Sequence, residues 1–472
     1  MIRAVIFDID GVLVDSEPVY LQGELDYLKD KYPHITYEDM VPTVGMSSKM
    51  FRKHFSDLLG MNPESEEFLN VIKEMNSGMK VDYPSIMRKD VKEVLKKLSQ
   101  MKMKLAVASS GDYKDVEKLL KECNIFDSFE VICTGDMFKE SKPNPDIYLT
   151  TMKKLGVKPE ECFVVEDSMM GIEAAKTAGA TVCAMIETRF PFSQEKADYH
   201  VSSLSEIIPI ISKQYKAVFF DVDGTLTDFV YHKMPEGNRI VLNRLREKGI
   251  KLFISTGRAK IEMKLAHMLE DEEFDGYIYA NGQQSEIHGE TVDLHYFNDE
   301  QLSLIKRYYA ENKVANVYYD TEGVFSSYID DKLKVVQDSI GCDVPPLKDW
   351  NDYDDLKITS MNSVLNDEQV TELCSMVKGI KCGRWCEYCV DLMTSDSGKD
   401  IGVEKICEAM GIDPFETLSF GDGENDIPML NRTGIGVAMG NSSDTVKENV
   451  TYVTDDFTDN GIYNALVYFG IL

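Results

Sequence analysis

The stretch VIFDIDGVLVD, residues 5 to 15, decides the fold of the first half of this chain, and VFFDVDGTLTD, residues 218 to 228, repeats it. Seven of the eleven aligned positions are identical, and each copy is a short apolar run that ends in Asp-x-Asp-Gly. A repeat offset by 213 residues in a chain of 472 predicts two large domains. We place them at residues 1–213 and 214–472.

Both halves alternate short apolar runs with helical patterns. The runs include AVIF, KLAVAS, CFVV and TVCAMI in the first half, and AVFF, KLFIS, YIYA and TLSF in the second. Such runs are typical of parallel strands that are buried on both faces and connected by crossover helices. The sequence therefore predicts two doubly wound, Rossmann-like α/β sheets.

Composition narrows the classes of partner and location. The formal net charge of −30 opposes binding to nucleic acid, because that requires clustered Lys and Arg against phosphates. No apolar run approaches the roughly 18 residues that a membrane span needs. The ten cysteines are scattered without a disulfide framework, which favours a reducing compartment. We expect a cytoplasmic protein with no nucleic-acid or membrane partner.

The repeated acidic motif predicts a metal site. In a parallel sheet the carboxyl ends of the strands open onto the ligand-binding crevice, and Asp8 and Asp221 follow directly after apolar runs. Asp10 and Asp223, two residues on, point to the same side if the chain stays extended. Paired carboxylates resist joint ionisation unless a cation lies between them, and hard oxygen ligands suit Mg²⁺.

Further polar residues follow in the same order in both halves, each after a strand or at the start of a helix. They are Ser109, Lys142, Glu166 and Asp167 in the first half, and Thr256, Lys399, Asp422 and Asp426 in the second. With the acidic motif, this ordered set resembles the sequence motifs of the haloacid dehalogenase superfamily, present twice. The resemblance covers nearly the whole chain.

This resemblance implies the same roles in each half. One aspartate attacks phosphorus and forms an aspartyl phosphate, and a second acts as general acid and base. A hydroxyl group binds a phosphoryl oxygen, and a lysine tethers the nucleophile and the transferring group. The residues in these roles are the nucleophiles Asp8 and Asp221, the acid-base residues Asp10 and Asp223, the hydroxyl residues Ser109 and Thr256, and the lysines Lys142 and Lys399.

The resemblance also implies Mg²⁺ as cofactor. The expected metal-site residues are Asp8, Asp10, Glu166 and Asp167 in the first half, and Asp221, Asp223, Asp422 and Asp426 in the second. Asp10 and Asp223 contribute their backbone carbonyls in this scheme. Glu166 and Asp426 are expected to orient ligands or metal-bound waters rather than to bind directly.

Unequal motif spacing predicts a cap subdomain in each half. Asp8 and Ser109 are 101 residues apart but Asp221 and Thr256 only 35, whereas Ser109 precedes Lys142 by 33 residues and Thr256 precedes Lys399 by 143. Insertions this long are not expected to be structureless loops. We predict a helical cap at about residues 16–85 and an α/β cap at about 285–390.

The first half resembles the β-phosphoglucomutase-like branch of the superfamily through DIDGVLVDSEP and SKPNPDIY. It departs at Tyr20, where that branch often has His, and at Ser47, Ser48 and Lys49, where the mutase has a phosphate-binding Arg. A mutase must hold a second phosphate, so these departures favour a phosphatase and leave a sugar-phosphate mutase as the alternative.

The second half resembles the Cof-type sugar phosphatase branch through FISTGR, YIYANG and FGDGENDIPML. Asn281 and Gly282 would then line the mouth of the site, although Asn-Gly is equally a hairpin turn. The leading hypothesis is a bifunctional phosphatase of small phosphorylated metabolites, with sugar phosphates as the expected class. The non-enzymatic alternative makes one half a binding or regulatory module.

Three cysteines suggest a different chemistry. Cys382, Cys386 and Cys389 have the spacing of an iron-sulfur motif in radical enzymes. Those enzymes place the motif early in a barrel, whereas here it falls within the second insertion. The run around Cys389 and Asp391 also alternates as a cap strand would, with both residues on one face. We expect a cap strand rather than a cluster.

Overall fold

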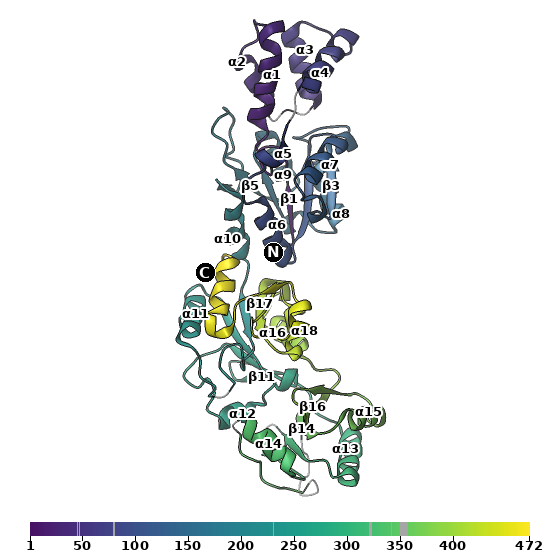
Figure 1. The fold of residues 1–472 in the computed structure, drawn as a ribbon, viewed down its shortest axis with the longest axis vertical. Coiled ribbons are helices and arrows are strands. Elements are labelled where there is room, and N and C mark those ends of the chain that lie inside the picture. The colour runs from purple at the N-terminus through teal and green to yellow at the C-terminus, as the bar shows by residue number, and fades with distance from the viewer. Residues whose placement is uncertain are drawn as a thin grey trace. The chain divides into compact units, whose positions relative to one another are not determined.

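The chain divides into two units, Met1–Gln214 and Tyr215–Leu472, each built on its own α/β core (Figure 1). The computed structural model describes residues 1–44, 46, 48–78, 81–229, 231–320, 323–340, 342–349 and 357–472, and it leaves out the side chains of residues 48, 49 and 76–78. Among these described residues, no helix is both long and apolar enough to cross a membrane.

The first unit contains a wholly parallel sheet of order β3-β2-β1-β4-β5-β6. The strand β1 lies between β2 and β4, and all four of its residues are buried because helices cover both faces. This order brings the ends of the three strands that carry the predicted site residues to one edge. The strands are β1 (Ala4–Phe7), β2 (Lys104–Ser109), β3 (Val131–Thr134), β4 (Cys162–Glu166), β5 (Thr181–Met185) and β6 (Tyr199–Val201).

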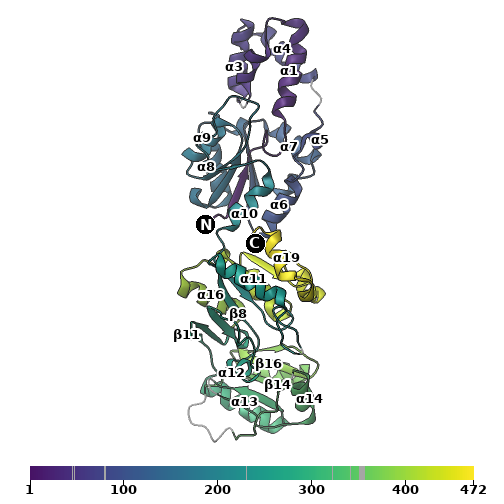
Figure 2. The same ribbon diagram turned by 90° about the vertical axis from the view of Figure 1, so that its left-hand side faces the viewer.

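Helices cover this sheet on both faces. Helices α8 and α9 pack against the face that bears Ala4 and Ile6, and α6 and α10 lie on the opposite side (Figure 2). The buried positions of α6 recur as a helical stripe, so its apolar side faces the sheet. These helices are α6 (Val91–Gln100), α7 (Tyr113–Glu122), α8 (Asp146–Leu155), α9 (Met169–Thr177) and α10 (Ile207–Ser212).

A helical cap with its own hydrophobic core is inserted between β1 and β2. Its two linkers pair with each other at Val14 and Met87. The cap helices are α1 (Glu17–Lys31), α2 (Tyr37–Met40), α3 (Ser48–Leu59), α4 (Glu66–Gly78) and α5 (Tyr83–Ile86). Tyr20 lies on α1, and its hydroxyl is 3.4 Å from that of Tyr83. Ser47 and the side chains of Ser48 and Lys49, where a mutase would bind phosphate, lie outside the described residues.

The second unit repeats the parallel arrangement and extends it at one edge. The sheet order is β11-β10-β9-β8-β7-β17-β18-β19, in which β10 and β11 are antiparallel to their neighbours. The strands are β7 (Ala217–Phe220), β8 (Lys251–Ser255), β9 (Gly276–Tyr279), β10 (Gln284–Ile287), β11 (Glu290–Leu294), β17 (Thr417–Gly421), β18 (Ile435–Ala438) and β19 (Tyr452–Val453).

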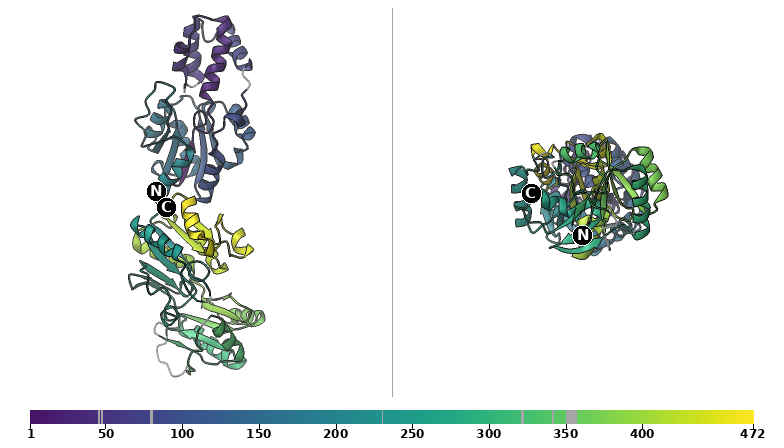
Figure 3. Two further views of the ribbon diagram at one scale, coloured as in Figure 1. Left: turned by 60° about the vertical axis from the view of Figure 1, so that its left-hand side comes forward. Right: turned by 90° about the horizontal axis from the view of Figure 1, so that it is seen from below.

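Helices from the two ends of this unit cover its sheet. Helices α16 and α17 pack with Phe219, Phe253 and Ile278 on one face. On the other, α11 and α19 lie side by side, although one is near the start of the unit and the other ends it (Figure 3). The core helices are α11 (Glu236–Glu247), α12 (Lys260–Leu265), α16 (Lys399–Met410), α17 (Ile427–Arg432), α18 (Asp444–Glu448) and α19 (Gly461–Tyr468).

The second cap is an antiparallel sheet of order β13-β12-β14-β16-β15 with helices α13, α14 and α15. Its strands are β12 (Asn316–Tyr319), β13 (Val324–Phe325), β14 (Ser360–Val364), β15 (Ile380–Arg384) and β16 (Cys389–Thr394), and its helices are α13 (Asp299–Asn312), α14 (Asp331–Ser339) and α15 (Asp367–Met376). The predicted cap start at about residue 285 is wrong, because β10 and β11 pair with the core sheet. The predicted end at about 390 is also early, because β16 runs to Thr394.

Candidate active sites

The first site is built around the buried pair of Asp8 and Lys142. Asp8 follows β1, and its Oδ1 lies 2.6 Å from Lys142 Nζ. The same ammonium group donates to Glu166 Oε1 at 2.5 Å and to the carbonyl of Ala108 at 2.9 Å. Both side chains are almost fully buried, so each charge depends on its partner. No described residue donates a hydrogen bond to the second oxygen of Asp8, which leaves that oxygen available to a ligand.

Glu166 holds Lys142 in place. Its Oε1 accepts hydrogen bonds from Lys142 and from the hydroxyl of buried Tyr148 at 2.6 Å. Its Oε2 accepts from the backbone N–H groups of Asp167 and Ser168 at 3.1 and 3.3 Å. Because both oxygens have protein partners, Glu166 is better suited to fixing the lysine than to binding a metal directly.

Asp8, Glu166 and Asp167 form a cluster in which one oxygen from each lies within 4.8 Å of the others. Gly11, at φ 74°, turns the chain so closely past this cluster that a Cβ there would lie 1.9 Å from Asp167 Oδ2. Burial raises the pKa of Asp8 to about 8 and that of Asp167 well above its usual range. A divalent cation would offset that cost, so these oxygen donors fit Mg²⁺.

Asp10 and Ser109 complete the first site. The carboxylate of Asp10 accepts a hydrogen bond from Ser16, and burial raises its pKa. Its side chain is not part of the acidic cluster found among the described residues. Ser109 ends β2, beside β1, and its hydroxyl accepts from the Gly111 N–H at 3.1 Å.

The second site repeats this arrangement. Lys399 Nζ, fully buried at the start of α16, lies 2.7 Å from Asp221 Oδ1 and 2.5 Å from Asp426 Oδ1. The other oxygen of Asp426 accepts from the N–H groups of Asp422 and Gly423 at 3.1 and 2.9 Å. Asp426 therefore fixes the lysine as Glu166 does in the first unit, although Glu166 is the last residue of β4 and Asp426 lies beyond the end of β17.

Asp221, Asp422 and Asp426 form the second acidic cluster. A Cβ at Gly224, at φ 79°, would lie 2.5 Å from Asp422 Oδ2, so the turn again passes close to the cluster. Burial raises the pKa of Asp422 to about 7 and that of Asp221 well above its usual range. Asn441 donates to Asp422 at 3.2 Å and orients it. This donor set fits Mg²⁺ as the first does.

Asp223 differs from its counterpart Asp10. Arg258 donates to both of its oxygens, at 2.7 and 3.0 Å, and His232 Nδ1 lies 3.3 Å away. Burial alone would raise the pKa of Asp223, but the contacts with His232 and Arg258 lower it below its usual value. The side chain of Asp223 is also outside the acidic cluster. Arg258 also lies close to Thr256, whose hydroxyl accepts from the Arg258 N–H at 3.1 Å.

A cavity of about 840 Å³ lies between the core and the cap of the second unit. Asn281 lines it from the core and donates to Asp391 Oδ2 at 2.9 Å, while Asn362 donates to Asp391 Oδ1 at 2.6 Å. Asn281 also lies in the turn between β9 and β10, so both readings of Asn-Gly describe this position. Gly282 is not among the lining residues, because it packs against the backbone of Gly398.

The three spaced cysteines belong to the cap. Cys382 lies in β15 and Cys389 in β16, and the possible metal clusters found among the described residues include no cysteine. Cys386 lines the cavity.

Several residues that complete the sites were not predicted from the sequence. Arg258 belongs to the motif FISTGR, two residues after Thr256, so the sequence carried a usable signal for it. Tyr148 likewise ends the motif SKPNPDIY, whereas only the fold brings Asn441 to the carboxylate that it contacts. The contacts of the cap residues Asp391 and Asn362 could not be predicted from the sequence either, because they join distant segments.

Comparisons with known proteins agree in both units. Models of the haloacid dehalogenase-like hydrolases match residues 5–185 and residues 218–466. The putative phosphatase YhcW of Bacillus subtilis is 31% identical over 211 residues, which are 44% of this chain and 94% of that protein. The phosphorylated carbohydrates phosphatase of Thermotoga maritima is 32% identical over 180 residues, 38% of this chain and 82% of that protein.

A solved structure is also similar to part of this chain. BT1666 of Bacteroides thetaiotaomicron, described as a phosphatase of the same superfamily, aligns with a TM-score of 0.51 and 27% identity. The alignment covers 55% of this chain and 97% of that one.

Proposed function

The chain belongs to the haloacid dehalogenase-like hydrolases and is a phosphoric monoester hydrolase, and we propose that each of its two units carries a separate Mg²⁺-dependent phosphatase site. The observation that carries the proposal is the repeated buried pair of an aspartate with a lysine beside an acidic cluster. A purely structural or regulatory unit would not need two buried charges at the carboxyl ends of its strands, where burial makes them costly.

In each unit the aspartate oxygen that is not bound to the lysine attacks the phosphorus of the substrate. A bond forms between Asp8 or Asp221 and phosphorus as the bond to the ester oxygen breaks. Asp10 gives a proton to the departing alkoxide, which leaves as an alcohol, and Asp223 does the same in the second unit once its carboxylate is released from Arg258. The same residue then takes a proton from water, whose oxygen attacks the aspartyl phosphate to release inorganic phosphate and the free aspartate.

The lysine and the hydroxyl residue stabilise the transferring group. Lys142 and Lys399 place a compact positive charge beside the nucleophile, where negative charge from the phosphoryl group accumulates. Ser109 and Thr256 offer a hydroxyl at the end of the neighbouring strand. Bound Mg²⁺, held by Asp8 and Asp167 or by Asp221 and Asp422, would supply charge neutralisation at the phosphoryl oxygens.

The substrate class that we propose is phosphorylated sugars. Phosphatases of this family act on phosphorylated carbohydrates, as the names of the Thermotoga relative and of hexitol phosphatase B state. The polar cavity wall of Asn281, Asn362 and Asp391 supports this choice for the second unit, because it offers donors and acceptors for hydroxyl groups.

The test is a panel of phosphorylated metabolites assayed for phosphate release with Asp8→Asn, Asp221→Asn and the double variant. Each single variant should lose its own group of substrates, and the double variant should lose all activity. A single variant that retains every activity would remove its unit from the proposal. Including a bisphosphorylated sugar as primer tests the alternative for the first unit, because a mutase would convert isomers without net phosphate release.

A further inference from the structure

The loop between β5 and β6 of the first unit connects the cap to the metal-site residue Asp167. This loop, residues 186–198, has no helix or strand. Loops of this length in a compact domain usually carry a function. We call its central part, Glu187–Gln194, the strap.

The strap contributes a residue to the hydrophobic core of the cap. Phe190 is only 6% exposed and belongs to the same cluster as Leu21, Phe55 and Phe68. Its ring stacks with that of Phe192, with centroids 6.3 Å apart. A residue that follows a strand of the core domain is thus buried with cap helices, so movement of the cap would have to move the strap or expose this ring.

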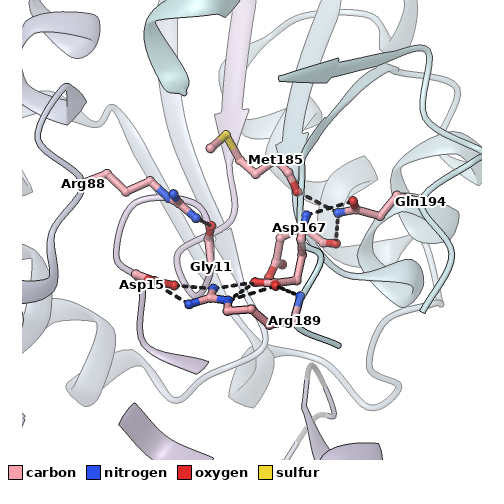
Figure 4. A network of polar contacts seen from close by, with 8 residues as sticks. Gly11, Asp15, Arg88, Asp167, Met185, Arg189 and Gln194 are labelled. Atoms are coloured by element: carbon pink, nitrogen blue, oxygen red, sulfur yellow. Dashed lines mark hydrogen bonds and ion pairs between the residues drawn. The ribbon is translucent and has the colours of Figure 1, made fainter. Parts of the chain in front are cut away.

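Arg189 fixes the strap to the linker that leads into the cap. Its two terminal nitrogens donate to Asp15 at 3.0 and 2.7 Å, and its Nε donates to Glu187 at 2.9 and 3.1 Å (Figure 4). Such a forked contact fixes orientation as well as distance. Asp15 precedes Ser16, the N-cap residue of the first cap helix, so this contact lies at the base of the cap.

Gln194 fixes the other end of the strap to the site. Its side-chain Nε2 donates to the carbonyl of Asp167 at 2.5 Å and to that of Met185 at 2.7 Å (Figure 4). Its Oε1 accepts from the Glu187 N–H at 3.1 Å. Both polar atoms of its side chain therefore hold together the end of β5, the start of the strap and the backbone of Asp167.

We propose that the strap couples the position of the cap to the geometry of the first metal site, with Gln194 and Arg189 as positioning residues. Contacts in the cap core and at Asp15 determine where the strap lies, and Gln194 transmits that position to Asp167. The inference rests on the proposed function only in naming Asp167 as a Mg²⁺ ligand.

The test is Mg²⁺ binding measured by calorimetry on the full chain carrying Asp422→Asn, so that the first site dominates the signal. Gln194→Ala should weaken binding about tenfold, the lower range for loss of a residue that supports a metal ligand. Phe190→Leu, which removes no polar contact with Asp167, should also weaken binding, by less than about tenfold, because it loosens the strap. Phe68→Leu is the matched control, since Phe68 is buried in the same cap cluster but lies outside the strap.

Arg189→Gln provides a second cap-side variant in case Phe190→Leu fails to fold. The proposal is overturned if both cap-side variants bind Mg²⁺ as tightly as the parent, or if Phe68→Leu weakens binding as much as Phe190→Leu does. In turnover assays, Asp221→Asn is added to every chain so that only the first site releases phosphate. The activity lost in Gln194→Ala should then return at high Mg²⁺ concentration, as expected when a positioning residue is removed. If the variants differ from the parent in Mg²⁺ binding as predicted but the parent releases no phosphate, the proposed function fails and the coupling stands.

Discussion

Replacing Lys399 with methionine tests how much the buried ion pair of the second unit contributes. Lys399 is fully buried, and its ammonium group contacts Asp221 at 2.7 Å and Asp426 at 2.5 Å. Methionine fills similar volume but leaves two buried carboxylates without their cation. Breaking a buried pair in this way costs about 3 to 5 kcal/mol, so we expect a loss of about 3 kcal/mol in the free energy of unfolding at pH 7.5.

The loss should depend on pH in a defined direction. Burial and the neighbouring Asp426 already raise the pKa of Asp221, and Lys399 opposes that rise. Without Lys399 the pKa in the folded state rises further above the unfolded value, so the folded variant binds protons that the unfolded chain has lost. Stability of the variant therefore falls as pH rises through this window, and the deficit at pH 7.5 should shrink toward pH 5.

Urea unfolding monitored by tryptophan fluorescence is the appropriate assay, because both tryptophans, Trp350 and Trp385, belong to the second unit. The matched control is Lys405→Met on the same helix, where a half-exposed lysine pairs with Glu408 at 3.3 Å. That substitution should cost less than about 1 kcal/mol. The reasoning is refuted if the two variants are equally stable, or if the deficit of Lys399→Met grows as pH falls.

Three further predictions address the sites. Gly11→Ala should abolish the Mg²⁺-dependent activity of the first unit, measured in a chain that also carries Asp221→Asn, because the added Cβ would overlap the Asp167 carboxylate. Gly60→Ala, where the added Cβ meets open space, should retain that activity. Chelation of divalent cations should remove phosphate release by both units, and Mg²⁺ should restore it better than Ca²⁺, whose longer bonds and higher coordination suit these small clusters poorly. Asp391→Ala should raise the KM of the second unit for sugar phosphates about tenfold, because hydrogen bonds to substrate hydroxyls are lost, while hydrolysis of p-nitrophenyl phosphate stays within about twofold. Equal effects on both substrates would contradict a role of Asp391 in binding sugar hydroxyls.

The sequence was sufficient for the α/β fold and for the residues at the strand ends. Asp8 and Lys142 could be chosen because each follows or precedes a regular element, and local patterns of apolar residues identify those elements. Asp221 and Lys399 could be chosen for the same reason. Local sequence also made the presence of two caps evident, since insertions of that length must fold.

The start of the second cap was predicted wrongly from the sequence, because β10 and β11 resemble cap strands locally. Only the pairing of β10 with β9 shows that they extend the core sheet. Strand pairing is a contact between distant residues, which a local pattern does not encode.

Sequence by itself determined which chemical groups are present and at which strand ends they lie, since those depend on periodicity and on chain order. The tertiary structure alone decided their partners: Asp10 accepts a hydrogen bond from Ser16, whereas Asp223 is paired with Arg258. It also brought Gln194 to the carbonyl of Asp167. The physical reason is that hydrogen bonds and ion pairs act over a few ångströms, so their energies depend on which distant segments packing brings together.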